Sequence, residues 1–223
     1  MKNQNTFNLI HENVFKEYQS IYENILTKIY PSKGSTGFTE RNLSVNFSKA
    51  YEKLANKNEL CAYTWFEFQF GDNNNNHLDA VIINDKTQEM FIIESKRYKS
   101  KRKRESIFSD IQRMPSFISD IKGRTDFNID NIDRFNYKYY GIILADVWTE
   151  RPAKKKICDT YQKNPEMDKN TFCDFFKKDK DSLDFMRDDK IYCKEQSFAN
   201  TKNVPDCVKQ NYHLVSMWWQ FRS

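Results

Sequence analysis

Leu78–Lys96, LDAVIINDKTQEMFIIESK, is the stretch from which we interpret the rest of the chain. Its two apolar runs predict two strands joined by a short turn. Residues two apart on a strand share a face, so Glu94 and Lys96 are expected to point to one side and Ser95 to the other. An antiparallel pairing of the two strands would bring Asp79, near the start of the first strand, level with Glu94.

This pairing would gather two carboxylates and one ammonium at the end of an otherwise apolar sheet. Two carboxylates at close range do not both ionise comfortably unless a cation lies between them. Mg²⁺ suits such a patch, because it accepts a few oxygen ligands and keeps several waters. We therefore expect a Mg²⁺ site at Asp79 and Glu94, with Mn²⁺ as an alternative ion.

An Asp on one strand followed by Glu-x-Lys on the next resembles the PD-(D/E)xK nuclease superfamily, which includes restriction endonucleases and DNA-repair nucleases. Asp79 and the run Glu94-Ser95-Lys96 make the match, and the residue before Asp79 is Leu where the family name has Pro. The resemblance covers residues 39–145, or about half of the chain. It implies an α/β fold with a restriction endonuclease-like core, in which helices flank a central mixed sheet.

The resemblance also implies a role for each motif residue. Asp79 and Glu94 would bind the metal together with the backbone carbonyl of Ser95. Lys96 would orient or deprotonate a water, or balance charge on the phosphorane. Family members often carry a further Glu on the helix before the first strand, and Glu40 matches it by position and by face. The alternative for Glu40 is a surface residue that satisfies the helix dipole.

Two helices are predicted before the hairpin. Apolar residues at helical spacing predict the first over residues 7–30, and Pro31 ends it. The second begins near Thr39 as N-cap, and its apolar stripe consists of Leu43, Phe47, Ala50, Tyr51 and Leu54. Glu40 continues this stripe, whereas Glu52 is expected to face solvent.

The run CAYTWFEFQF, residues 61–70, predicts a strand paired with the Asp79 strand. Its alternation predicts one fully apolar face, made of Thr64, Phe66, Phe68 and Phe70. Glu67 would lie beside the site as an additional acidic ligand, or would face solvent. His77 would hold a phosphate or a water, or would simply be exposed where the turn ends.

The densest positive charge of the chain follows the motif directly. Its members are Arg97, Lys99, Lys101, Arg102, Lys103 and Arg104. Basic side chains that neutralise phosphates supply much of the affinity for nucleic acid and do not read its sequence. Their position next to the carboxylates favours phosphate contact over an ordinary solvated run of charge.

A helix over residues 106–122 and a buried strand within 135–148 complete a strand–helix–strand crossover, which predicts a mixed sheet. Pro115 is expected to kink or restart this helix. Gln112 lies on it, near the expected cleft. Some exonuclease branches of the family carry Gln with a Tyr four residues later, but Ser116 stands there, so that branch is not supported.

The expected organisation is a nuclease-like core with its N-terminal helix over residues 1–149, a polar helical appendage over 150–210, and a strand that returns to the core over 211–223. Within the appendage, residues 168–186 are the best helix candidate. In a sequence-specific nuclease such a segment would read bases in the major groove.

Composition bounds the class of protein. With 223 residues, 39% hydrophobic and 30% charged, the chain fits a globular protein rather than a disordered one. A net charge of +5 is compatible with a polyanionic partner. Five cysteines without zinc-knuckle spacing indicate free thiols in a cytoplasmic protein. No signal peptide, membrane span or nucleotide-binding loop is expected.

These observations predict a Mg²⁺-dependent DNA endonuclease that hydrolyses phosphodiester bonds, of the type II restriction kind, and they are compatible with a homodimer that would cut both strands. A DNA-repair or structure-specific nuclease is the first alternative. A catalytically inactive DNA-binding module of the same fold is the second, and a chance match within a surface salt-bridge set is the third. The recognition site and the oligomeric state stay open.

Overall fold

The computed structural model describes residues 6–28, 39–71, 76–98, 101–123, 137–148, 150–152, 161–163, 186–204 and 206–222. The main-sheet strands are β1 (Ala62–Phe70), β2 (Asn76–Asn84), β3 (Glu89–Tyr98), β4 (Lys138–Trp148), β7 (Met186–Ser197) and β8 (Tyr212–Phe221). The helices are α1 (Thr6–Lys28), α2 (Glu40–Lys57), α3 (Lys101–Gly123) and α5 (Asp206–Asn211).

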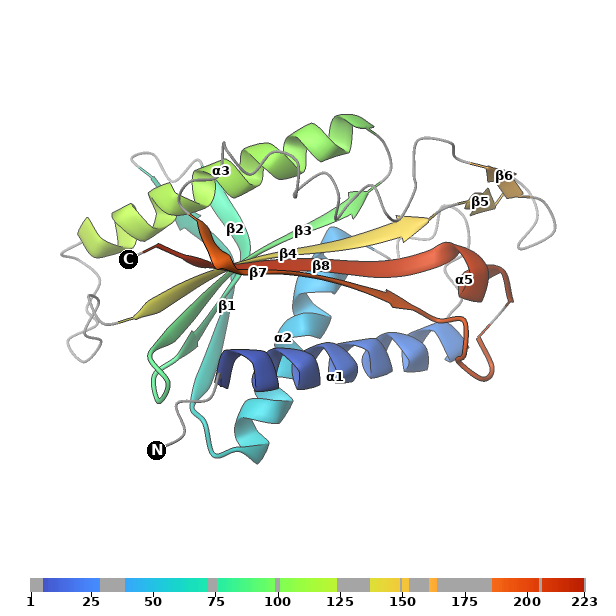
Figure 1. Cartoon of the computed structure of the whole chain (residues 1–223), viewed down its shortest axis with the longest axis horizontal. Coiled ribbons are helices and arrows are strands. Elements are labelled where there is room, and N and C mark those ends of the chain that lie inside the picture. The colour runs from blue at the N-terminus through green and yellow to red at the C-terminus, as the bar shows by residue number, and fades with distance from the viewer. Residues whose placement is uncertain are drawn as a thin grey trace.

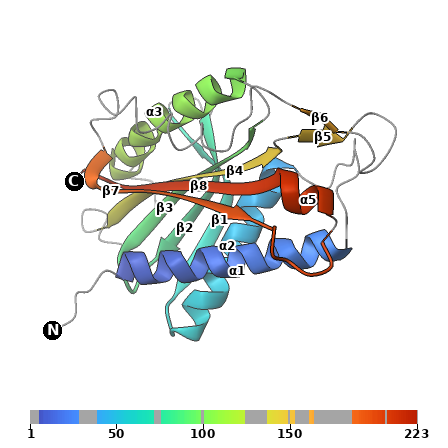
Figure 2. The same cartoon turned by 45° about the vertical axis from the view of Figure 1, so that its right-hand side comes forward.

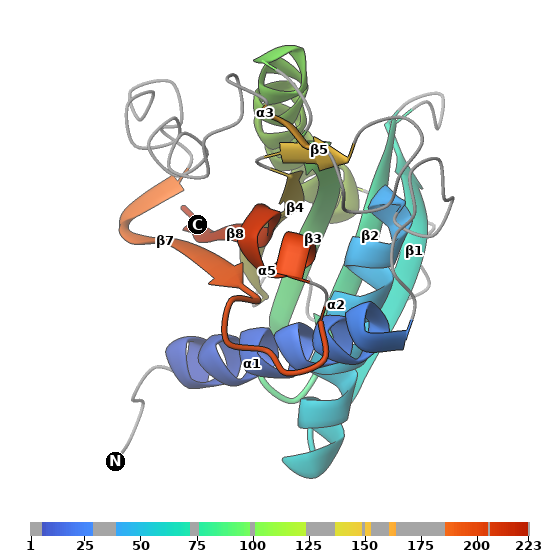
Figure 3. The same cartoon turned by 90° about the vertical axis from the view of Figure 1, so that its right-hand side faces the viewer.

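A six-stranded sheet in the order β1-β2-β3-β4-β8-β7 forms the middle layer. Helix α3 lies on one side of it, and α1 and α2 lie on the other (Figure 1). The views in Figures 2 and 3 keep the same three layers. β3 and β4 are parallel, with α3 as the crossover between them, and the other neighbours pair antiparallel. The predicted α/β class, with a mixed sheet flanked by helices, is confirmed.

Alternation along β3 assigns its residues to two separate cores. Phe91 and Ile93 pack on the side of α1 and α2, whereas Met90 and Ile92 pack on the side of α3. All four side chains are buried, and each contributes on the order of 2 kcal/mol. Because the alternation continues to the end of the strand, the even-numbered residues after Ile93 are directed toward α3.

The predicted helices are present, with small differences at their ends. Thr39 is the N-cap residue of α2, with extended φ and ψ of −93° and 158°, but its side chain makes no capping hydrogen bond. Glu52 is not simply turned to solvent, because its Oε1 accepts a hydrogen bond from Thr64 Oγ1. Helix α3 starts at Lys101 and continues through Pro115 to Gly123 without restarting.

Strand β1 does not have the single apolar face that its alternation predicts. Glu67 has a positive φ of 53°, and the two faces of the strand exchange at this residue. Before it, Ala62 packs on the side of α1 and α2; after it, Phe68 and Phe70 pack on the side of α3. Side chains from the two halves of the strand therefore cannot form one continuous face.

The region after β4 differs from the predicted helical appendage. Within residues 150–210 the structure describes strands β5 (Glu150–Pro152), β6 (Tyr161–Lys163) and β7, together with most of the short α5. β5 and β6 pair in a small sheet of their own beyond the end of β4 (Figure 2). β7 pairs with β8 at the edge of the main sheet. The predicted helix over 168–186 lies outside the described residues except for Met186, which begins β7.

The returning strand predicted within residues 211–223 is present as β8, and it lies between β4 and β7. Its Trp219 packs in the core on the side of α3. None of the helices in the described part of the chain is long and apolar enough to cross a bilayer.

Candidate functional site

The hairpin of β2 and β3 brings the two motif carboxylates together. The last paired residues of its ladder are Ala80 and Ile93, and the next level would join Asp79 to Glu94. The backbone ladder ends at this point, where Asp79 Oδ2 accepts the backbone N–H of Ser95 at 2.6 Å. The Asp79 carboxylate therefore holds the β3 backbone immediately beside Glu94.

Glu94 and Lys96 lie on the same face of β3, as their spacing predicts. Lys96 Nζ is 3.6 Å from Glu94 Oε2. The Glu94 side chain is 2% exposed and that of Lys96 is 14% exposed, so both charged groups lie largely out of water. Such groups are costly to bury unless they are paired.

Two residues of α3, missed by the sequence interpretation, complete this cluster. Lys96 Nζ lies 2.9 Å from Asp110 Oδ2. Arg113 Nη2 lies 2.9 Å from Glu94 Oε1 and 2.8 Å from Asp110 Oδ1. Three residues apart, Asp110 and Arg113 share a helical face. That spacing shows that the two residues share a face, but it does not show that the face meets β3. Gln112, which the sequence places near the expected cleft, is exposed.

Burial and neighbouring carboxylates control the ionisation of Glu94. Burial, followed by the charges of Asp79 and Asp110, raises the pKa of Glu94 to about 8, and Lys96 and Arg113 oppose this rise. Burial would lower the pKa of Lys96, but Glu94 and Asp110 outweigh it, so the Lys96 pKa is raised. Lys96 is therefore an ammonium at neutral pH.

Asp79 is also shifted toward its neutral form. Burial is the largest cause of its raised pKa, and the Ser95 N–H and Lys96 act in the opposite direction. The charges of Glu67 and Glu40 raise the pKa of Asp79 further. This electrostatic coupling shows that both additional acids proposed from the sequence lie in the neighbourhood of Asp79.

The two additional acids are held differently. Glu40 Oε1, at the start of α2, accepts the backbone N–H of Arg97 at 3.1 Å. Glu67 forms an exposed ion pair with Arg41 at 3.0 Å, and its Oε2 is 3.9 Å from Nε2 of His77. Glu40 is thus tied to the end of β3, whereas Glu67 and His77 lie at the solvent-facing edge strand and its neighbour.

The basic run divides between two elements. The Arg97 side chain is 3.3 Å from Asp146 on the neighbouring strand β4, and so it is committed to an internal ion pair. Lys99 lies outside the described residues. The remaining members, Lys101, Arg102, Lys103 and Arg104, form the first turn of α3, directly after the strand that carries the motif.

The oxygens at this site fit a hard cation that keeps part of its hydration. Asp79 and Glu94 would hold Mg²⁺ with the Ser95 carbonyl, and waters would fill the remaining positions. Among the residues that the structure describes, no group of three or more His, Cys, Asp or Glu side chains is arranged to hold a metal. Asp79 and Asp110 nonetheless raise the pKa of Glu94 although Lys96 and Arg113 oppose them, so a further cation would be favoured here.

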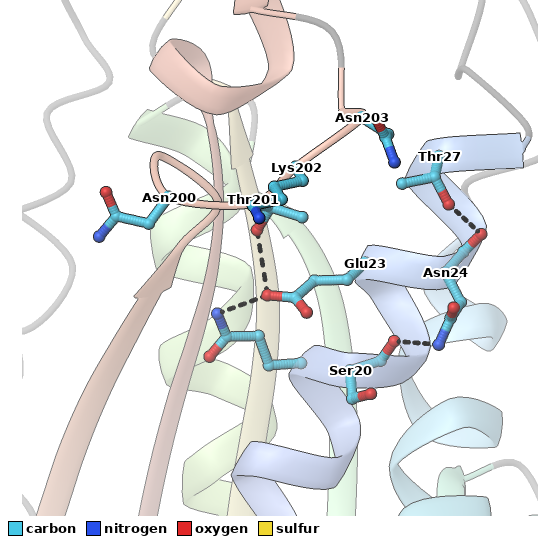
Figure 4. Close-up of a pocket in the computed structure, with 9 residues that line it drawn as sticks. Ser20, Glu23, Asn24, Thr27, Asn200, Thr201, Lys202 and Asn203 are labelled. Atoms are coloured by element: carbon cyan, nitrogen blue, oxygen red, sulfur yellow. Dashed lines mark hydrogen bonds between the residues drawn. The ribbon is translucent and has the colours of Figure 1, made fainter.

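A separate polar hollow of about 670 Å³ lies between α1 and the loop that follows β7 (Figure 4). Thr201 Oγ1 donates a hydrogen bond of 3.0 Å to Glu23 Oε1 across it. Asn24, Thr27 and Lys202 also line this hollow. None of the site residues predicted from the sequence lines it, so it is distinct from the carboxylate cluster.

Comparison with known proteins adds no relative to this description. No protein-family model matches the chain, and searches of curated proteins and of solved structures give no significant match. The geometry around Asp79, Glu94 and Lys96 is therefore the basis for a functional assignment.

Proposed function

We propose that this chain is a Mg²⁺-dependent DNA endonuclease that hydrolyses phosphodiester bonds, with restriction-type cleavage as the favoured form. The observation that supports the proposal is the convergence of Asp79, Glu94 and Lys96 where the β2–β3 ladder ends. Their order along the chain and their positions on adjacent strands are those expected from a resemblance to the PD-(D/E)xK nucleases.

Asp79, Glu94 and the Ser95 carbonyl would hold the ion. When bound there, Mg²⁺ would polarise the scissile phosphate and lower the pKa of a coordinated water. Lys96 is protonated at neutral pH because Glu94 and Asp110 raise its pKa. It therefore suits the stabilisation of negative charge on the phosphorane, or the orientation of a water, better than proton abstraction.

The start of α3 supports a polyanionic substrate. The macrodipole of a helix disfavours positive charge in its first turn, yet α3 begins KRKR and has no acidic residue there. A phosphate bound nearby would offset this repulsion and would also gain the orphan N–H groups of the helix. The net charge of +5 also favours binding of a polyanion.

Cleavage of plasmid DNA in Mg²⁺ by the full-length protein tests the assignment. Asp79→Ala and Lys96→Ala should each lower the rate about a hundredfold or more, because each removes a group that acts on the reacting phosphate. Lys53→Ala removes a cation whose ion pair with Glu17 joins α2 to α1, and it should cut like the wild type. Cleavage by the Asp79 and Lys96 variants at the rate of the wild type would contradict the roles assigned to these residues.

The substrate range separates restriction-type cleavage from its alternatives. A restriction-type enzyme should cut intact duplex plasmid at defined sequences. A repair or structure-specific nuclease should prefer flapped, branched or single-stranded DNA. Cleavage of RNA of the same sequence shows whether the enzyme is specific for DNA.

An inactive DNA-binding module is the second candidate, and one observation favours it. Lys96 and Arg113 already contact the two Glu94 oxygens, at 3.6 Å and 2.9 Å, so this carboxyl group has partners without a metal. Binding to DNA that weakens steeply with salt, with no cleavage in Mg²⁺ or Mn²⁺, would identify such a module.

A further inference from the structure

Arg113 contacts the buried Glu94 carboxyl group and is itself partly exposed. Its side chain is 34% exposed, whereas that of Glu94 is 2% exposed. A single guanidinium nitrogen, Nη2, serves both Glu94 and Asp110, at 2.9 Å and 2.8 Å. Nε of Arg113 is buried and has no hydrogen-bond partner among the described residues. The guanidinium therefore keeps a desolvated donor that its present contacts do not use.

We propose that Arg113 is a phosphate-binding residue of the site. When a divalent cation binds Glu94, the guanidinium leaves that carboxylate, stays anchored on Asp110, and binds an oxygen of the phosphodiester. This inference rests on the proposed nuclease function and assigns to it a residue that the sequence motif does not contain.

We call this movement of Arg113, from Glu94 to the phosphate when a metal binds, the exchange. Competition for one oxygen of Glu94 is the first reason to expect it. Glu94 Oε1 accepts from Arg113, and a metal bound at Glu94 would need this carboxylate as a ligand. A divalent cation and a guanidinium repel each other at such range, so the two cannot share the carboxylate without cost. Arg113 is the partner with a path toward solvent, because Glu94 is fixed in β3.

The geometry of the guanidinium is the second reason. Its planar fork of N–H donors matches the oxygens of a phosphate, and such pairs are often bidentate. Nε has no partner among the described residues. Nη2 carries two N–H donors, so when it leaves Glu94 one donor becomes available while the other stays on Asp110.

Asp110 acts as a positioning residue in this arrangement. Its two oxygens hold different cations, with Oδ1 on Arg113 and Oδ2 on Lys96. Arg113 therefore keeps an anchor on α3 when it loses Glu94, and Lys96 stays beside the reacting group. The two cations would then approach a phosphate from fixed positions.

The exchange predicts opposite effects of one substitution. In Arg113→Ala, the cation that competes with the metal is absent, so Mg²⁺ binding measured by calorimetry without DNA should become about fivefold tighter or more. Cleavage, measured as kcat/KM on duplex DNA, should fall about a hundredfold, because a donor to the phosphate is lost. A purely structural ion pair would weaken both properties together.

Arg113→Lys is the conservative variant and guards against a fold that Arg113→Ala disrupts. It keeps the positive charge beside Glu94 but cannot form the planar fork. Its Mg²⁺ affinity should stay close to that of the wild type, while its cleavage should fall about tenfold or more. Lys53→Ala, outside the cluster, should change neither property.

The two proposals fail in different ways. Weaker Mg²⁺ binding by Arg113→Ala, or cleavage by Arg113→Lys at the rate of the wild type, overturns the exchange while the nuclease assignment stands. If the wild type binds Mg²⁺ but cuts no nucleic acid, the nuclease assignment fails. In that case DNA binding in Mg²⁺ replaces cleavage as the measurement, and an Arg113→Ala variant that binds DNA as well as the wild type overturns the phosphate contact.

Discussion

At the scale of single residues, Glu94 couples the site to the stability of the fold. Burial, with Asp79 and Asp110, raises its pKa from 4.5 to about 8 in the folded protein. Between these values the unfolded chain has released the proton and the folded protein retains it. The contribution of Glu94 to stability is therefore complete below about pH 4.5 and is lost as the pH rises through about 8.

Glu94→Gln should remove this part of the pH dependence. The wild type should lose on the order of a few kcal/mol of unfolding free energy across that range in the absence of divalent metal, and the variant should lose less. Urea unfolding at a series of pH values measures the difference. Parallel profiles for the two proteins would show that Glu94 does not titrate in this window.

Gly141 in β4 lies between Ile92 of β3 and Trp219 of β8, and its lack of a side chain makes room for the indole. A Cβ atom built on Gly141 would lie 2.1 Å from a ring carbon of Trp219, its partner on β8. Trp219 is fully buried, so the indole has little room to move. Gly141→Ala should lower the unfolding free energy by about 1–3 kcal/mol, measured in urea, and should leave Mg²⁺ binding unchanged.

The motif residues could be predicted from the sequence because strand periodicity is local. Two-residue spacing is enough to put Glu94 and Lys96 on one face, and the turn sets the pairing that brings Asp79 close. Arg113 and Asp110 could not be found in this way. Helical spacing identifies residues that share a face, but it does not tell which polar residues of that face meet a strand distant in the chain.

At the scale of elements, β1 shows where alternation fails as a guide. The positive φ of Glu67 is a conformation that L-residues with side chains rarely adopt, and glycine is its usual occupant. Nothing in WFEFQF marks the position, so the sequence predicts one apolar face where the structure has two half-faces.

A pair of substitutions tests this conformation. Glu67→Val places a β-branched residue at positive φ, whereas Glu67→Gly adopts it freely. Both remove the exposed ion pair with Arg41, so that loss cancels in the comparison. The valine variant should be less stable than the glycine variant by about 1–2 kcal/mol in thermal unfolding. Equal stabilities would argue against a left-handed residue at this point.

Strand β7 was missed for a different reason. Its sequence, MRDDKIYCKEQS, is largely polar and is interrupted by charges. As an edge strand with β8 as its neighbour in the sheet, it needs few apolar residues. Composition alone therefore favoured a solvated appendage, and the pairing with β8 is a long-range contact that no local pattern records.

At the scale of the whole molecule, the proposed function requires a charged path for the polymer. The first turn of α3 follows directly on the strand that carries Glu94 and Lys96, so its four basic residues lie next to the cluster along the chain. Phosphate contacts made there release counterions from the DNA. The salt dependence of DNA binding therefore reports how many such contacts form.

Neutralising Lys101 and Lys103 together should weaken binding to all DNA sequences alike and should reduce the slope of log K against log salt by about 2. The matched control changes Lys53 and Lys57 of α2 to Gln, which removes the same charge from exposed positions on another helix. Fluorescence anisotropy at several salt concentrations gives both slopes. If the two double variants lose the same affinity and slope, the net charge of the molecule determines DNA binding, and the start of α3 has no special part in it. A loss confined to the α3 variant places the polymer over the first turn of α3.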